Sequence, residues 1–142
     1  MREILFRGKR ADNGEWIKGS LLKVTISGKT YWLIFTDNFA QFNAEIKAVQ
    51  HACVDPATVG QYTGLTDKNG VMIFEGDILE HHVQGDILVN RGVVEWDDCD
   101  GRWAHQLNTM SPSFCMCNSS AIEVIGNIYD NPELMDKVTD DV

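Results

Sequence analysis

The amino-acid sequence predicts a mainly β protein, with an N-terminal antiparallel meander, a small SH3-like barrel and a short C-terminal helix. Strand-like apolar runs recur about every ten residues, single glycines separate them, and Asn-Gly turns stand at Asn13-Gly14 and Asn69-Gly70. A chain of 142 residues has the length of one domain. Its predicted sub-regions are a meander over 1–57, a barrel-like half over 58–135 and a frayed tail over 136–142.

The first half contains three strands separated by turns. They are Ile4–Gly8, Glu15–Ile26 and Tyr31–Phe35, with Trp16, Leu21 and Val24 as candidate inward residues. Gly19 indicates a bulge in the long second strand. The continuous apolar run of the third strand indicates burial on both faces, or one face used at an interface. For residues 37–52 we expect a loop followed by a strand, although the apolar positions there also have an approximately helical spacing.

The stretch Thr58–Leu79, TVGQYTGLTDKNGVMIFEGDIL, joins the two halves. Asn69-Gly70 predicts a hairpin, because a primed turn requires positive φ at both central positions. The carboxylates of Asp67, Glu75 and Asp77 have two interpretations: they shape the backbone, or they form a cluster for a cation or a catalytic proton. Turns recruit Asp and Glu for local hydrogen bonds, so we prefer the first interpretation.

The second half contains five short strands, which favour closure into a barrel. They are Val71–Glu75, Ile78–Gln84, Asp86–Trp96, Arg102–Leu107 and Ala121–Ile128. The polar segment Ser111–Ser120 is expected to be a loop. Asn131 as an N-cap, followed by Pro132 at the first helical position, predicts one short helix.

The net charge of −9, from 21 Asp and Glu against 12 Lys and Arg, disfavours general binding to nucleic acid. The charge is uneven, since residues 1–30 carry seven Lys and Arg against three Asp and Glu. An acidic DNA mimic, or DNA contact through the basic N-terminal strands, therefore stays open as an alternative. Without a membrane-length apolar run or a signal-peptide core, we expect a cytoplasmic protein with no membrane association.

No metal ion, cofactor or enzymatic activity is expected. Cys115 and Cys117 have a CxC spacing, which is too short for the usual zinc knuckle, and no second paired motif accompanies them. A GxSxG elbow and a glycine-rich phosphate loop are both missing from the sequence. A small hydrolase is therefore the third and least favoured function.

An acidic turn flanked by two tryptophans is the candidate partner groove. It comprises Trp96, Trp103, Asp97, Asp98 and Asp100. The turn faintly resembles a calcium loop, but Asn108 stands where the twelfth-position glutamate belongs. The aromatic pair either stabilises a hairpin or lines a groove in which the acidic loop selects a basic peptide.

Three stretches of the sequence are distinctive in combination: MREILFRGKRADNGEWIKGSLL, TVGQYTGLTDKNGVMIFEGDIL, and GVVEWDD followed by IEVIGNIYDNPELM. Together they resemble the YopX protein family of phages and prophages. The resemblance covers residues 2 to 135 and implies a small, β-rich, cytoplasmic, oligomeric protein. The family has no agreed catalytic or binding residues, so it assigns none here. The segment Leu107–Ser120 and the Cys and His residues are not part of its pattern.

We therefore expect a non-enzymatic protein-interaction module that forms a homo-oligomer and acts on a host or phage protein. Its contacts would use exposed strand edges or the apolar Tyr31–Phe35 face.

Overall fold

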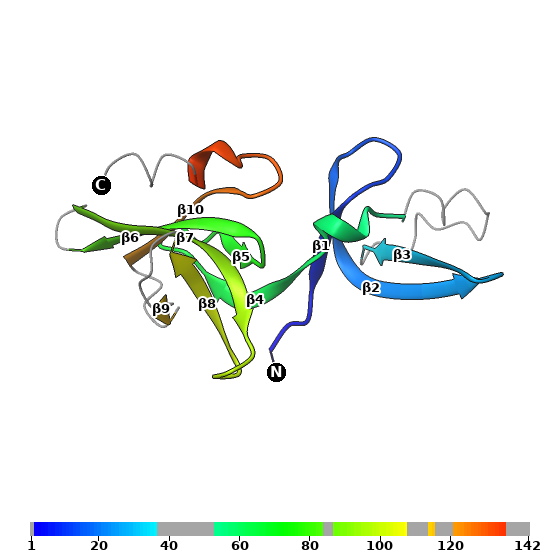
Figure 1. Cartoon of the computed structure of the whole chain (residues 1–142), viewed down its shortest axis with the longest axis horizontal. Helices are drawn as coiled ribbons and strands as arrows, with labels where there is room; N and C mark the ends of the chain where they lie inside the picture. Colours follow the sequence, from blue (N-terminus) through cyan, green and yellow to red (C-terminus); the bar gives the residue numbers. More distant parts are fainter. Residues whose placement is uncertain (1, 37–52, 84–86, 108–113, 116–120, 136–142) are drawn as a thin grey trace. The chain divides into compact units, whose positions relative to one another are not determined.

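The structure, a computed structural model, describes residues 2–36, 53–83, 87–107, 114–115 and 121–135. These residues form two antiparallel sheets of five strands each (Figure 1), which confirms the mainly β prediction. The strands are β1 Phe6–Lys9, β2 Trp16–Ile26, β3 Lys29–Phe35, β4 Gly60–Thr66, β5 Met72–Phe74, β6 Asp77–Val83, β7 Ile87–Asp97, β8 Arg102–Leu107, β9 Phe114–Cys115 and β10 Ile122–Asn127. A short 3-10 turn, η2, spans Pro56–Thr58.

The first sheet has the strand order β3-β2-β1-β4-β5, and the second has the order β10-β6-β7-β8-β9. The chain divides into two compact units, an N-terminal unit Met1–Tyr62 and a C-terminal unit Thr63–Val142. This division falls within β4, whereas the sequence places its sub-region boundary between residues 57 and 58.

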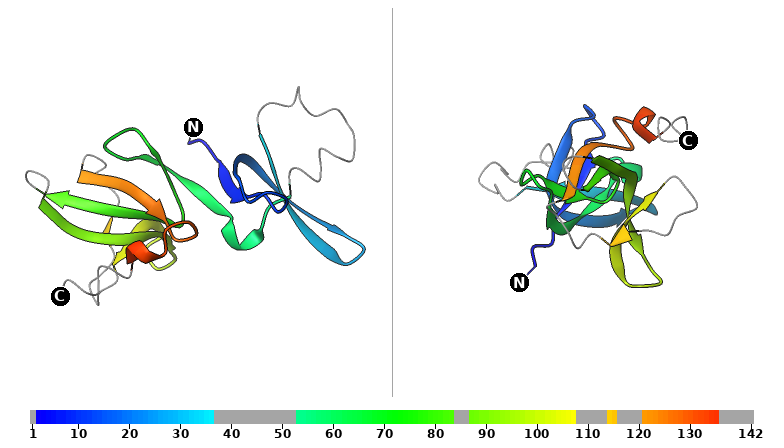
Figure 2. Two further views of the ribbon diagram at one scale, coloured as in Figure 1. Left: turned by 90° about the horizontal axis from the view of Figure 1, so that it is seen from above. Right: turned by 90° about the vertical axis from the view of Figure 1, so that its left-hand side faces the viewer.

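In the N-terminal unit, β2 changes partner along its length. Its first residues pair with β1, up to Gly19 opposite Phe6, and its remaining residues pair with β3, from Ser20 opposite Phe35. Figure 2 shows the resulting β2–β3 hairpin. A Cβ on Gly19 would lie 1.9 Å from the carbonyl oxygen of Phe35, so only glycine fits there. The bulge predicted at Gly19 is wrong: β2 keeps its register, and the glycine serves a close backbone approach.

In the C-terminal unit, the core lies between β5 and the second sheet. Its buried side chains come from four strands, and Trp103 and Val124 pack against them. The buried residues are Ile73, Leu79, Val94 and Ile122. Burial of these side chains is the main stabilising contribution to this unit.

The closed barrel predicted for this half is not formed by the described strands. The second sheet has open edges at β10 and β9, and β5, predicted as a barrel strand, belongs to the first sheet. β9 lies inside the predicted loop Ser111–Ser120, where Phe114 and Cys115 pair with His105 and Ala104. With only two residues, β9 is too short to pair along β10 and so close the second sheet into a barrel.

The C-terminal helix begins as predicted. Residues 133–135 are helical, and the carbonyl of Asn131 accepts a 3.1 Å hydrogen bond from the N–H of Leu134. The Asn131 side chain, however, accepts from the N–H of Asn127, so it caps the preceding turn. The predictions for residues 37–52 and 136–142 lie outside the described residues. Among the helices of the described part, none has the length and apolar character needed to cross a membrane.

Candidate functional site

Two of the three carboxylates of the joining stretch, Asp67 and Asp77, are engaged by the backbone, as the preferred interpretation predicted, and the third, Glu75, is half-buried. Asp67 is buried and accepts hydrogen bonds from the N–H groups of Asn69, Val71 and Val124, at 2.8, 2.9 and 3.0 Å. Asp77 is also buried and accepts from the N–H of Phe74 at 2.8 Å. These two side chains therefore stabilise the turns around β5.

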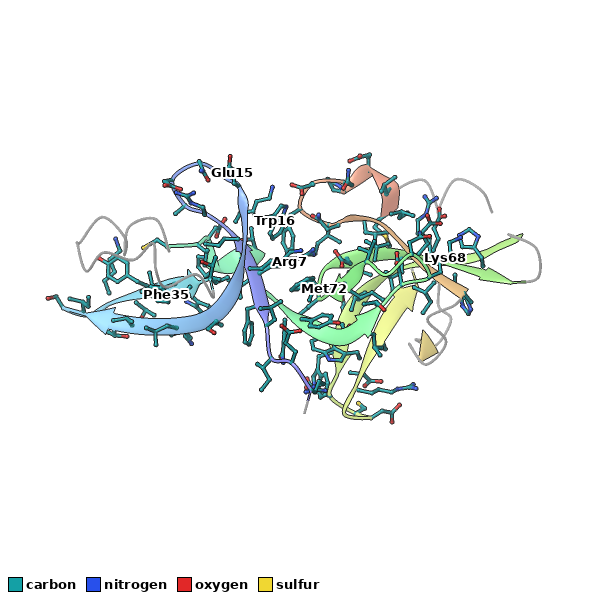
Figure 3. All side chains as sticks on the ribbon, turned by 180° about the vertical axis from the view of Figure 1, so that it is seen from behind. Arg7, Glu15, Trp16, Phe35, Lys68 and Met72 are labelled. Atoms are coloured by element: carbon teal, nitrogen blue, oxygen red, sulfur yellow. The ribbon has the colours of Figure 1, made fainter. Side chains whose placement is uncertain are left out.

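One face of the second sheet carries a network of opposite charges. Glu80 on β6 stands between Glu123 on β10 and Arg91 on β7 in the strand register. Arg91 contacts Glu80 at 2.5 Å, and Lys68 (labelled in Figure 3) lies 3.4 Å from Glu123. Nε2 of His82 lies 3.2 Å from Glu80 and 3.9 Å from Glu123. The cations compensate the repulsion of two facing carboxylates.

Glu80, His82 and Glu123 also have the residue types of a metal site. Their ligand atoms lie within 4.8 Å of one another. Both carboxylates are already paired with a cation, so a divalent ion would compete with Arg91 and Lys68 for their negative charge. We interpret the group as an ion-pair network. The sequence did not reveal it, because its members come from separate strands that only the sheet register aligns.

The predicted partner groove is a hairpin tip. Trp96 and Trp103 are register partners on β7 and β8, with ring centroids 5.1 Å apart and ring planes at 76°. Trp96 is 44% exposed, whereas Trp103 packs against the core. The structure thus brings the aromatic pair together and gives its two members different environments.

The acidic turn beyond these tryptophans is ordered by its own first carboxylate. Asp97 accepts hydrogen bonds from the N–H groups of Cys99 and Asp100, at 3.0 and 3.3 Å. Arg102 lies 3.8 Å from Asp97 and 3.3 Å from Asp100. Asp98 and Asp100 are exposed, so the tip presents negative charge beside an exposed indole. A role in partner binding stays a prediction.

The N-terminal unit carries an apolar hollow of about 440 Å³ on one face of the β2–β3 hairpin, which we call the apolar face. It is lined by Leu22, Val24, Ile26, Tyr31, Leu33, Phe35 and Cys53. Leu22 lies opposite Leu33 and Val24 lies opposite Tyr31, and alternate residues of each strand share one side of the sheet. Leu22 and Ile26 are 48% and 59% exposed.

The sequence indicated the β3 half of this face but, on β2, identified only Val24 and missed Leu22 and Ile26. The signal was present as the alternation of Leu22, Val24 and Ile26 along β2. The opposite side of the hairpin differs, because Nζ of Lys23 lies 4.5 Å from the ring centroid of Trp32 in a cation–π contact. A similar contact places the Arg7 guanidinium 4.7 Å from the Trp16 ring centroid (Figure 3).

Fold and site together define a mainly β protein of two open antiparallel sheets, with an apolar face on the N-terminal unit and an ion-pair network on the C-terminal unit. The family model described as YopX protein matches residues 5–136. The chain therefore belongs to the YopX family, which confirms the resemblance seen in the sequence.

Among solved structures, the chain is similar to the crystal structure of protein EF1440 from Enterococcus faecalis. The TM-score is 0.51 and the sequence identity is 23%, over 95% of this chain and 99% of that chain. At this identity the similarity shows the fold alone. No curated protein matches the chain.

Proposed function

We propose that this protein is a non-catalytic interaction module of phage or prophage origin, which self-associates in the cytoplasm through the apolar face of β2 and β3. The exposure of Leu22 and Ile26 beside a 440 Å³ apolar hollow carries this proposal. Each Å² of apolar surface removed from water contributes about 25 cal/mol, and contiguous apolar patches mark interaction sites. A host or phage protein is the second kind of partner for this face.

The state of the acidic side chains supports a non-catalytic role. Asp67 and Asp77 accept hydrogen bonds from backbone N–H groups, and Glu80 and Glu123 are paired with cations. Each of these four carboxylates thus has a structural partner in the folded chain.

The charge distribution favours one alternative, an acidic DNA mimic. The N-terminal unit carries eight Lys and Arg against six Asp and Glu, and the C-terminal unit carries four against 15. Their formal net charges are therefore +2 and −11. Binding to a DNA-binding protein but not to bare duplex would favour mimicry, and salt-sensitive binding to duplex would favour direct DNA contact.

Self-association is tested by sedimentation velocity on the full chain over a concentration series. We expect concentration-dependent assembly that Leu22→Asp or Ile26→Asp abolishes, because a charge cannot be buried in an apolar contact without a partner. Ile4→Asp is the matched control, since Ile4 is 66% exposed but does not line the hollow. A wild-type monomer at all concentrations, or equal assembly of all variants, would contradict the proposal.

A further inference from the structure

We infer that the apolar face receives the Trp96 hairpin, residues 95–102, of a second copy of this chain. This inference rests on the proposed self-association and names the surface that fills the hollow. It assigns a common role to the exposed indole of the C-terminal unit and the exposed hollow of the N-terminal unit.

Trp96 has the properties of an anchor residue. It is 44% exposed, and its edge-to-face contact with Trp103, at 5.1 Å between centroids, restricts its orientation. Trp103 is itself packed against the core, so the β7–β8 hairpin that carries the pair is anchored there. A pre-ordered aromatic side chain loses little conformational entropy on binding, and tryptophan is enriched among residues that dominate interface energies.

The hollow suits an indole in both size and lining. Its volume of about 440 Å³ lies within the ~300–1,000 Å³ range of pockets that hold small molecules. Tyr31 and Phe35 offer aromatic surfaces, and Nζ of Lys29 lies 5.2 Å from the Tyr31 ring centroid. Lys29 shares the alternation of Tyr31 and Leu33 on β3, so a cation stands at the rim of the apolar face.

The segments that carry the two surfaces have opposite charges. Residues 16–36 contain Lys18, Lys23 and Lys29 and no Asp or Glu, a formal charge of +3; Lys29 stands at the rim of the apolar face, and Lys23 lies on the opposite side of the hairpin. Residues 95–102 contain four carboxylates and Arg102, a formal charge of −3. Contact between the apolar faces of two copies would bring together two positively charged segments. Contact between the apolar face and the Trp96 hairpin brings a positively charged segment to a negatively charged one.

This contact joins different patches on the two copies, which makes a mixing experiment decisive. Trp96→Ala leaves the apolar face intact, and Leu22→Asp leaves the Trp96 hairpin intact. We expect each variant alone to associate at least about 30-fold more weakly than wild type, the loss typical of one dominant interface residue. An equal mixture should recover a dimer, because the Leu22→Asp copy still offers Trp96 and the Trp96→Ala copy still offers the hollow.

Sedimentation velocity of each variant and of the mixture gives the result, with Val71→Ala as the control. Val71 is 47% exposed on the same unit as Trp96 and lies outside the hairpin. Far-UV circular dichroism checks that every variant is folded. Rescue in the mixture, together with association that weakens between about 0.1 and 1 M salt, supports the inference.

The other outcomes separate this inference from the proposed function. Normal association of Trp96→Ala with loss in Leu22→Asp would overturn the Trp96 contact and retain self-association through the apolar face. Loss in both variants without rescue in the mixture would also overturn it. Normal association of both variants, or a monomeric wild type, would overturn both proposals.

Discussion

The carboxylate of Asp67 accepts a 3.0 Å hydrogen bond from the backbone N–H of Val124, a residue 57 positions further along the chain. Its other oxygen accepts from Asn69 and Val71, inside the turn that Asp67 begins. One buried side chain therefore closes the hairpin before β5 and attaches it to β10. Burial raises the pKa of Asp67, but hydrogen bonds from Val124, Val71 and Asn69, with the charge of Lys68, bring it below its ordinary value of 3.8.

Replacing Asp67 by Asn should lower the free energy of unfolding by about 1–3 kcal/mol at pH 7. Only the oxygen of an asparagine amide accepts hydrogen bonds, so at least one of the three N–H groups loses its acceptor. A lowered pKa in the folded state means that the carboxylate stabilises the fold above pH 3.8 and that this contribution is lost as pH falls further. The difference between wild type and Asp67→Asn should therefore narrow below pH 3.8 in urea titrations. The same pH-dependent difference for the exposed Asp98→Asn control would contradict this account.

Replacing Gly76 by Ala should cost more than the same change at Gly70. Both have positive φ, 89° and 80°, which costs about 1–2 kcal/mol for alanine. A Cβ at Gly76 would in addition lie 3.0 Å from the Tyr129 ring, whereas a Cβ at Gly70 meets nothing within 4 Å. We expect an extra cost of about 1–3 kcal/mol at Gly76, measured by denaturant unfolding. Equal losses at the two glycines would show that the Tyr129 contact is unimportant.

Replacing Arg91 by Ala should destabilise the C-terminal unit by about 1–3 kcal/mol, because it leaves Glu80 facing Glu123 and removes a hydrogen bond to the Leu134 carbonyl. Adding Glu80→Gln should recover part of this loss, since it removes one of the facing charges. A double-mutant cycle on unfolding free energies measures the coupling. Additive effects would indicate that Arg91 and Glu80 are not energetically linked.

The two tryptophans of the hairpin should respond differently to truncation. Trp103→Ala removes a side chain packed against the core and should cost about 2–4 kcal/mol of unfolding free energy. Trp96→Ala removes an exposed ring and should cost less than about 1 kcal/mol. Thermal and urea unfolding of the monomeric protein distinguish them. Equal losses would mean that Trp96 is a structural residue and unavailable as an anchor.

Zinc should not stabilise the protein through Glu80, His82 and Glu123, because the two carboxylates are already engaged by cations. A site with a Kd of about 1 μM would add about 2.7 kcal/mol at about 100 μM free zinc. We expect no such rise in the thermal midpoint of protein freed of metal by chelation. A rise that disappears in His82→Ala would identify a metal site.

Local sequence patterns predicted the strands well, but predicted their partners less well. The primed turn predicted at Asn69-Gly70 is wrong, because Gly70 has positive φ and Asn69 does not. The strand Tyr31–Phe35 and the start of the C-terminal helix after Asn131 follow from short-range backbone preferences. The barrel was wrong because closure depends on which distant strands pair, and β5 joins the sheet of β1 to β4. The strand β9 was missed because two residues carry no measurable periodicity.

Composition, turn residues and the motifs of Thr58–Leu79 were sufficient to establish a mainly β chain of the YopX family with backbone-shaping acids. These are properties of neighbouring residues, and local chemistry determines them. The pairing of Leu22 with Leu33, the Glu80–Arg91 contact and the unequal burial of Trp96 and Trp103 required the folded chain. Each depends on the exact register of paired strands or on which side chains of the sheet pack against the core, and both are properties of the folded sheet rather than of neighbouring residues.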